Sequence, residues 1–308
     1  MPSLQNGLGL DYVECLFVSN EVDGTRSTAI ANNPLRSVQA TLSHIQGRLN
    51  AGLRHFLVVG VCDRPSLDLP KSKDFCVCTL LTQARKLWGQ SLTLIADVGL
   101  SPYQSNGHSV VIRQADGLID EEGSYVAAAR LAESFIGAGA DAVAPCLSLP
   151  RQTSVIRAHL DGLGLKHGEI LPYTVKLSSS LYGPYRGAIG SELGLLRKSY
   201  QFDHRDADLA FAQLRDDLRQ GAVGTIVKPA LTCLDLLART VATISQPVAV
   251  YHVSGEYMMA IHAAEAGLID VDDYFDEVHS AFHRCGARYV IGYSAQHFLR
   301  WQTVLQSS

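Results

Sequence analysis

The chain has 308 residues, of which 47% are hydrophobic and 18% are charged, so it holds enough apolar material for a large core and too little charge for disorder. Its formal net charge of −4 argues against a nucleic-acid or anionic-membrane surface, which needs clustered Lys and Arg. We therefore expect small-molecule partners, with no nucleic acid and no membrane.

The N-terminus and the cysteines indicate where the protein works. The first stretch, MPSLQNGLGLDYVECLFV, has no basic segment followed by an unbroken apolar run, and no later stretch is long enough to span a bilayer. The seven cysteines are odd in number and scattered, which fits reduced thiols better than a disulfide framework. Cys76 and Cys78 lack a second pair at zinc-finger spacing, so unligated thiols are favoured over zinc there. We expect a cytoplasmic protein.

Short apolar runs alternate with longer amphipathic runs along the whole chain. The predicted strands cover residues 16–20, 55–61, 92–98, 140–145, 170–176, 224–229, 248–253 and 289–294. Helical patterns lie between them, for example at 35–53, 124–140, 209–222 and 273–287.

Each predicted helix leads into the next strand, and no linker or composition shift marks a second domain. This alternation predicts an α/β fold, a single (β/α)8 TIM-barrel domain over residues 1–308 in which residues 1–14 form a short N-terminal arm. A doubly wound open sheet is the alternative. The chain has no G-x-G-x-x-G after the first strand, no G-x-x-x-x-G-K-[ST], no H-E-x-x-H and no G-x-S-x-G, so no motif supports nucleotide binding, zinc proteolysis or serine hydrolysis.

Polar residues that close an apolar strand are the candidates for chemistry, because functional groups of a barrel gather at the carboxyl ends of its strands. They are Asp97, Lys176, Lys228, Ser254 and Tyr293. Burying two ammonium groups is costly, and each positive charge lowers the pKa of the other. An uncharged amine can then attack a ketone and form an imine. The alternative is that each lysine pairs with a carboxylate at the barrel mouth.

The segment LSSSLYGPYRGAIGS after Lys176 has neither helical nor strand periodicity and is rich in Ser, Gly and Tyr, as substrate-facing loops are. It contains Arg186, and Arg197 and Lys198 follow it. Guanidinium groups suit bidentate capture of a carboxylate, so this region could hold an acidic keto substrate. Solvated surface arginines are the alternative for either residue.

Several stretches together resemble the porphobilinogen synthase family, also called 5-aminolevulinate dehydratase. They are GADAVAP, YTVKLSSSLYGPYRGAIGS, TIVKPALTCLDLL and VAVYHVSGEYMMAIHAAEAGLID, in the same order as in the family, together with LFVSNEVDGTR and ADVGLSPYQSNGHS. The resemblance spans nearly the whole chain. It implies a TIM barrel whose mouth condenses two molecules of 5-aminolevulinate into porphobilinogen with loss of two waters.

The resemblance also implies roles for single residues. Lys228 resembles the Schiff-base lysine of the A site and Lys176 that of the P site, and Asp97 is expected to take part in catalysis. The expected substrate-binding residues are Arg186, Arg197 and Gln201 on the A side, Ser254 and Tyr293 on the P side, and Tyr182 and Tyr251 in the pocket.

Two stretches depart from the family. Gly99, Ser101 and Ser109 replace its cysteines or aspartates in the metal segment, and none of them is a good zinc or magnesium ligand. We therefore expect no metal and no other cofactor. After the fourth strand the acid-rich stretch is replaced by PCLSLPRQTSVIR, in which Cys146 and Leu147 supply no carboxylate.

Three functions remain open from the sequence. The first is a metal-independent porphobilinogen synthase, and the second is a specialised paralogue that joins 5-aminolevulinate or a close analogue into a different product. The third is a non-catalytic paralogue that binds a keto acid and has a regulatory role. A homo-oligomer is expected, and the short arm favours a dimer over the octamer of the family.

Overall fold

Parallel strands form the centre of the computed structural model, which describes residues 9–68, 70, 72–190 and 200–307. These strands are, in chain order, β1 (Asp11–Val18), β4 (His55–Gly60), β5 (Thr93–Val98), β8 (Ala142–Pro145), β9 (Glu169–Ile170), β10 (Val175–Lys176), β11 (Thr225–Lys228), β12 (Val248–Tyr251) and β13 (Tyr289–Gly292). Hydrogen-bonded neighbours follow the order β10, β11, β12, β13, β1, β4, β5, β8, β9, and each pair in that order is parallel.

The two ends of this order belong to one extended segment, residues 169–177. The N–H of Leu171 donates to the carbonyl of Val143 at 2.9 Å, and the carbonyl of Pro172 accepts the N–H of Ile226 at 2.9 Å. The segment therefore bonds β8 on one side and β11 on the other, which closes the sheet into a ring. The predicted barrel is confirmed and the open doubly wound sheet is wrong.

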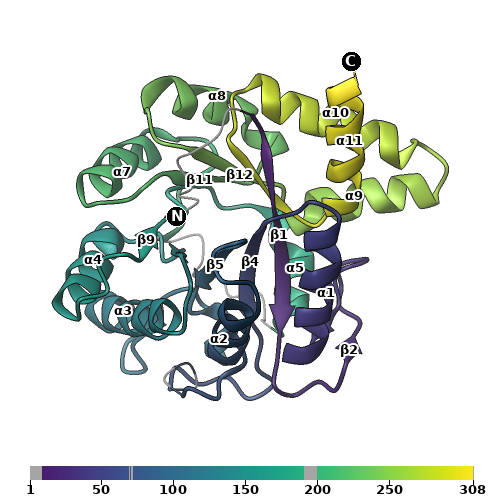
Figure 1. The fold of residues 1–308 in the computed structure, drawn as a ribbon. Helices are drawn as coiled ribbons and strands as arrows, with labels where there is room; N and C mark the ends of the chain where they lie inside the picture. The colour runs from purple at the N-terminus through teal and green to yellow at the C-terminus, as the bar shows by residue number, and fades with distance from the viewer. Residues whose placement is uncertain (1–8, 69, 71, 191–199, 308) are drawn as a thin grey trace.

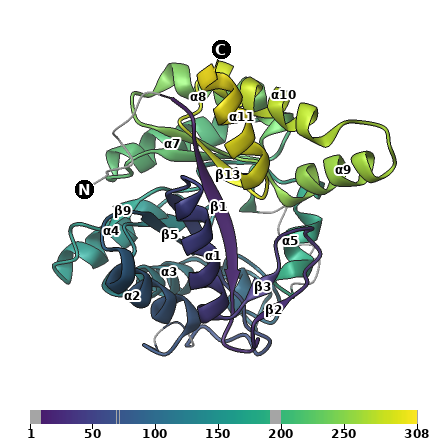
Figure 2. The ribbon, with the colours of Figure 1, turned by 45° about the vertical axis from the view of Figure 1, so that its right-hand side comes forward.

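Helices surround this ring, as Figures 1 and 2 show. They are α1 (Val38–Asn50), α2 (Cys76–Trp88), α3 (Glu121–Gly137), α4 (Gln152–Gly162), α7 (Asp208–Arg219), α8 (Leu234–Thr243), α10 (Val271–Arg284) and α11 (Ala295–Ser307). None of the helices in the described residues is long and apolar enough to cross a lipid bilayer.

Further short elements follow the carboxyl ends of the strands. They are the helices α5 (Gly183–Ala188) and α9 (Ser254–Glu265), the 3-10 turns η2 (Ser101–Tyr103), η3 (Ser180–Tyr182) and η4 (Leu231–Cys233), and the paired strands β2 (Thr25–Arg26) with β3 (Leu35–Arg36) and β6 (Val111–Ile112) with β7 (Ile119–Asp120). All of them build the mouth of the barrel, where substrates bind in this fold.

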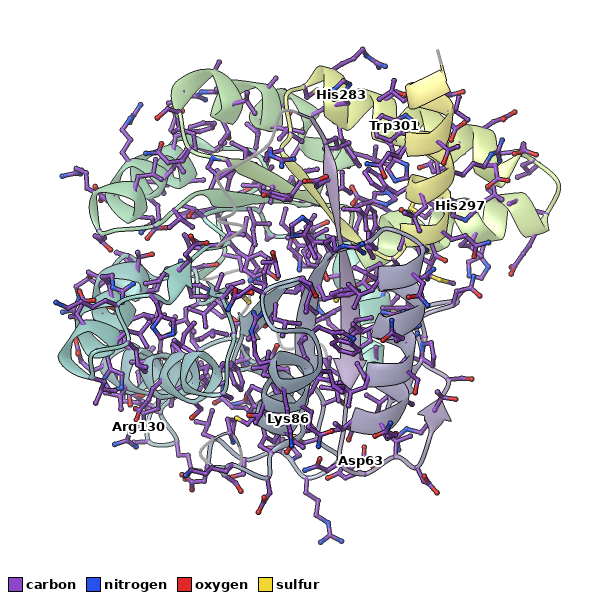
Figure 3. The ribbon with its side chains drawn as sticks, in the orientation of Figure 1. Asp63, Lys86, Arg130, His283, His297 and Trp301 are labelled. Carbon is purple, nitrogen blue, oxygen red and sulfur yellow. The ribbon has the colours of Figure 1, made fainter. Side chains whose placement is uncertain are left out.

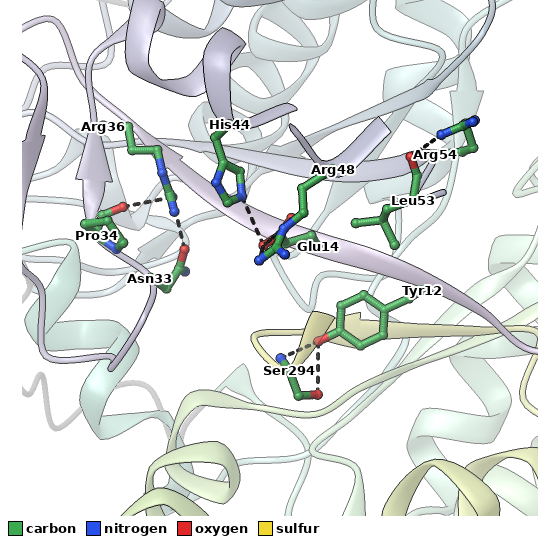
Figure 4. A network of polar contacts seen from close by, with 10 residues as sticks. All are labelled: Tyr12, Glu14, Asn33, Pro34, Arg36, His44, Arg48, Leu53, Arg54 and Ser294. Atoms are coloured by element: carbon green, nitrogen blue, oxygen red, sulfur yellow. Dashed lines mark hydrogen bonds and ion pairs between the residues drawn. The ribbon is translucent and has the colours of Figure 1, made fainter. Parts of the chain in front are cut away.

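The first strand begins at Asp11, five residues before the predicted start, so residues 11–14 of the expected arm are strand. Residues 1–8 lie outside the described residues. Glu14 interrupts the apolar run, but its carboxylate accepts from His44 and Arg48 of α1, with the Arg48 Nε 3.0 Å away (Figure 4). Burial would raise the pKa of Glu14, and these two partners lower it overall. The contacts of His44 and Arg48 with Glu14 thereby attach α1 to β1.

The C-terminal helices α10 and α11 pack against each other on the outside of the ring. Figure 3 shows His283, His297 and Trp301 together on α10 and α11. The indole of Trp301 donates to Ser280 at 3.0 Å and lies edge-on to the ring of His283. Trp301 is buried, and an aromatic contact plus a satisfied indole N–H is the arrangement that allows Trp to pack there. It fixes α11 against α10.

Candidate active site

Side chains of the barrel strands alternate between an inner layer and an outer layer that faces the helices. In β5, Ile95 lies in the inner layer and Ala96 in the outer one. In β11, Ile226 lies inside and Val227 outside. The same period of two places Asp97, Lys228, Tyr251 and Tyr293 inside at the carboxyl ends of their strands, at one end of the ring.

Lys176 reaches this inner face only because the fifth strand departs from strict alternation. Tyr173 belongs to the inner layer, whereas Thr174 points outward and donates to Asp217 of α7 at 2.7 Å. Val175 also lies in the outer layer. The residues between β9 and β10 thus shift the pattern by one, and Lys176 faces inward together with Tyr173. Lys176 and Lys228 are direct partners in the β10 and β11 register.

Lys228 lies in a pocket of tyrosine rings and is 9% exposed. Its Nζ is 4.0 Å from the ring centroid of Tyr251, and the rings of Tyr173, Tyr182 and Tyr185 follow at 5.0 Å, 5.2 Å and 5.4 Å. Burial, and next the charge of Lys176, lower the pKa of the amine to about 8. The aromatic faces also attract the cationic form of the Lys228 amine, so the pocket holds this amine whether it is protonated or neutral.

Lys176, 4% exposed, contacts Cys146 twice. Its Nζ donates to the Cys146 carbonyl at 3.0 Å and lies 3.4 Å from the Cys146 Sγ. Within the described part of the chain neither lysine amine pairs with a carboxylate. Among these residues the ion-pair alternative therefore finds no support.

Asp97 is the buried carboxyl nearest to this chemistry. It accepts a hydrogen bond from the Tyr173 hydroxyl at 2.9 Å and from the Gly99 N–H at 2.9 Å. Burial raises the pKa of Asp97, against the opposing effects of Lys228, the Tyr173 hydroxyl and Lys176. A carboxyl with a raised pKa can give or take a proton near neutral pH.

Two hydroxyl groups lie beside Lys228 on the inner face, one on β12 and one just after β13. Tyr251 and Tyr293 are joined by a 3.0 Å hydrogen bond, and the Tyr251 hydroxyl also lies 3.2 Å from the thiol of Cys15. Ser254, which opens α9, accepts the N–H of Tyr185 at 2.9 Å. Its own O–H can donate to a carboxylate, as the P-side role requires.

A buried carboxylate positions the loops that carry these groups. Glu256 accepts the N–H groups of Ala230 and Leu231, just after Lys228, and that of Val253 at 2.7 Å. Burial raises the pKa of Glu256, and the backbone donors oppose that rise by stabilising its charged form. Several hydrogen bonds to one carboxyl group form a rigid link. The start of α9 is thereby fixed to the end of β11.

The remaining predicted substrate-binding residues lie around the mouth. Tyr182 donates to the Leu177 carbonyl at 2.6 Å, and the guanidinium carbon of Arg186 is 5.9 Å from the Tyr182 ring centroid. Gln201 is buried beside Phe202, whose carbonyl accepts the N–H of Ser178. Arg197 lies outside the described residues. The structure thus brings Asp97, both lysines and the predicted tyrosines together at one end of the barrel, with Ser254 hydrogen-bonded beside them and Arg186 against Tyr182.

The residues at the family's metal position do not fit a divalent ion. Gly99 supplies no side chain, and a Cβ there would come 2.7 Å from the Asp97 Oδ1 and 3.2 Å from the Cys146 Sγ. Ser101 and Ser109 are buried hydroxyls, which are weak ligands for zinc and magnesium. Among the described residues no group of three or more His, Cys, Asp or Glu side chains could hold a metal.

Comparisons with known proteins agree with this geometry. Residues 9–301 match the model of the delta-aminolevulinic acid dehydratase family. The chain is 37% identical to the enzyme of that name from Streptomyces coelicolor, over 94% of this chain and 89% of the relative. It is 33% identical to the one from Candida glabrata, over 93% and 86%. The chain belongs to the delta-aminolevulinic acid dehydratase family.

A solved structure of the family has the same fold. The delta-aminolevulinic acid dehydratase of Toxoplasma gondii, in complex with the reaction product porphobilinogen, superimposes with a TM-score of 0.91. It is 30% identical, and the match covers 97% of this chain and 87% of that one. The family resemblance seen in the sequence is thereby confirmed, as is the expectation of an enzyme.

Sequence reasoning missed two contributors to this site. Tyr173 lies inside a predicted strand and three positions before Lys176, a spacing that strict alternation assigns to opposite faces. The sequence draws attention to Cys146 only because it supplies no carboxylate. Cys146 nevertheless follows β8 directly, so it lies at the C-terminal end of a strand, as Asp97 does. A search for every polar residue at a strand end would have found it.

Proposed function

We propose that this protein condenses two molecules of 5-aminolevulinate into porphobilinogen with release of two waters. One observation supports this above the others, namely two inward lysines in register on neighbouring strands, of which Lys228 has a pKa of about 8. Each lysine would hold the ketone of one substrate as an imine, which fixes two mobile molecules in one geometry.

The residues around each lysine have distinct tasks in this reaction. The uncharged amine of Lys228 attacks one ketone, and the tyrosine pocket holds the resulting cationic imine. Asp97, whose pKa is raised by burial, would remove a proton next to an imine carbon and so provide the enamine for carbon–carbon bond formation. Arg186 and Gln201 would take the A-side carboxylate, and Ser254 and Tyr293 the P-side one.

The reaction would run without a divalent metal, because the residues at the family's metal position do not fit one. The polarisation of the substrate would come from the imine nitrogens and from the buried hydroxyl groups at the mouth.

The compartment and the assembly are also proposals. All seven cysteines are described and unpaired, which suits a reducing compartment such as the cytoplasm. We predict a homo-oligomer and favour a dimer. Light scattering coupled to size-exclusion chromatography measures the mass of the assembly in solution.

The test uses purified protein treated with a chelator and then incubated with 5-aminolevulinate. One sample is reduced with borohydride and its adducts are located by peptide mapping, and a parallel unreduced sample is analysed for products. Adducts on both lysines together with porphobilinogen are expected. Adducts with a different product would contradict the proposed product and favour a specialised paralogue, and no adduct at either lysine would contradict the imine mechanism and favour a non-catalytic binder.

A further inference from the structure

Cys146 is the residue that holds the amine of Lys176. The half-buried thiol follows β8 directly, and its 3.4 Å contact reaches Lys176 on the neighbouring segment of the ring. The backbone of the same residue fixes the amine through its carbonyl at 3.0 Å. Gly99 leaves the space that the thiol occupies, because a Cβ at that position would come 3.2 Å from the Sγ. The packing therefore holds the Cys146 thiol, which carries a proton, against the Lys176 nitrogen, which is the reacting atom.

Imine formation at Lys176 needs such a group. When the amine adds to a ketone, it gives a carbinolamine whose hydroxyl leaves only after it receives a proton. The nearest buried carboxyl, Asp97, already accepts hydrogen bonds from Tyr173 and Gly99. The stretch after β8, where the family carries acids, supplies none here. Within the described residues the thiol is thus a proton-carrying side chain in direct contact with the Lys176 nitrogen.

We propose that Cys146 is a catalytic residue that protonates the leaving hydroxyl at Lys176, an inference that rests on the proposed imine mechanism. The S–H bond breaks and its proton goes to the hydroxyl, the carbon–oxygen bond breaks and water leaves. The nitrogen lone pair forms the carbon–nitrogen double bond. The products are a cationic imine on Lys176, a Cys146 thiolate beside it and one water, so atoms and charge balance.

The thiolate then has a second use. It stands against the positive imine nitrogen and stabilises it, and it can take the proton back when the imine is hydrolysed or transferred. A serine at this position could still donate a hydrogen bond but is a much weaker acid, and an alanine could do neither. The two substitutions therefore separate proton transfer from simple packing.

The experiment follows imine formation at each lysine separately. Wild-type protein, C146A, C146S and the control C285A are mixed with 5-aminolevulinate, quenched with borohydride at short times and mapped by mass spectrometry. Cys285 ends α10, before β13, on the side of the barrel away from the mouth, and it offers a matched loss of a half-buried thiol. The adduct at Lys228 in each sample serves as an internal check that the barrel is folded.

We expect the rate at Lys176 to fall on the order of 100-fold in C146A, with an intermediate rate in C146S and the wild-type rate in C285A. The rate at Lys228 should stay within about twofold. Equal rates at Lys176 in wild type and C146A overturn the role of Cys146 and leave the proposed function intact. An equal loss at both lysines in C146A also overturns it, because the proton donor would then not be specific to Lys176. A wild-type protein without any adduct overturns the proposed function and this inference with it.

Discussion

Replacing Lys176 with Met tests whether the two lysines activate each other. They are partners in the β10 and β11 register, on neighbouring strands about 5 Å apart. Two unit charges at about 7 Å repel by about 2 kcal/mol at an effective dielectric constant of about 20. This repulsion corresponds to a change of between one and two in the pKa of the partner amine.

The consequence for reactivity is large at neutral pH. With a pKa of about 8, about 9% of the Lys228 amines are uncharged at pH 7. In K176M the burial of Lys228 remains but the neighbouring charge is lost, so its pKa rises. The uncharged fraction at pH 7 then falls about 30-fold, and so does the rate of imine formation at Lys228.

The measurement is trace acylation of Lys228 between pH 6 and pH 11, with the labelled peptide quantified by mass spectrometry. The midpoint should move from about pH 8 to between about 9 and 10 in K176M. The control is K86M, which removes an equal charge from the exposed face of α2, where Figure 3 shows Lys86. A midpoint that does not move in K176M would refute mutual repulsion and leave burial as the sole cause.

Three further predictions follow from buried groups. Burial lowers the pKa of His252 to about 3, so the unfolded chain takes up a proton there first as the pH falls below about 6.5. The contribution of His252 to the free energy of unfolding should therefore fall by about 2 kcal/mol between pH 7 and pH 5. Urea unfolding measures this loss, and the H252L variant should lack it. Y173F removes a hydrogen bond that holds down the pKa of Asp97, so the acidic limb of the rate profile should move to higher pH. G99A should lower kcat at least about tenfold by displacing the Asp97 carboxylate, with KM changed less, and an unchanged kcat would contradict the close packing.

The barrel could be predicted from the sequence because its strands are buried on both faces. Each predicted run of apolar residues became a strand of the ring or a part of one, since a parallel sheet covered by helices excludes water from both sides. The start of β1 was missed because Glu14 interrupts its apolar run. Only the structure shows that His44 and Arg48 approach this carboxylate from α1.

The inner face of the site was predictable where alternation holds and unpredictable where it fails. Asp97 and Lys228 occupy inner positions that a period of two assigns correctly. Tyr173 and Lys176 share a face because the chain between β9 and β10 shifts by one residue, and no local signal in the sequence sets such a shift. It arises from the bonds to two neighbouring strands that close the ring.

The contact between Cys146 and Lys176 bears on the two departures from the family that the sequence leads us to expect. The first is a lack of acids after β8, and the second is a lack of metal ligands around Gly99. In the structure they meet, because the absent side chain at Gly99 makes room for the thiol that faces Lys176. A carboxylate or a metal ligand at position 99 would compete for that space. The two departures are therefore compatible with one rearranged site, in which a thiol acts where the family has acids.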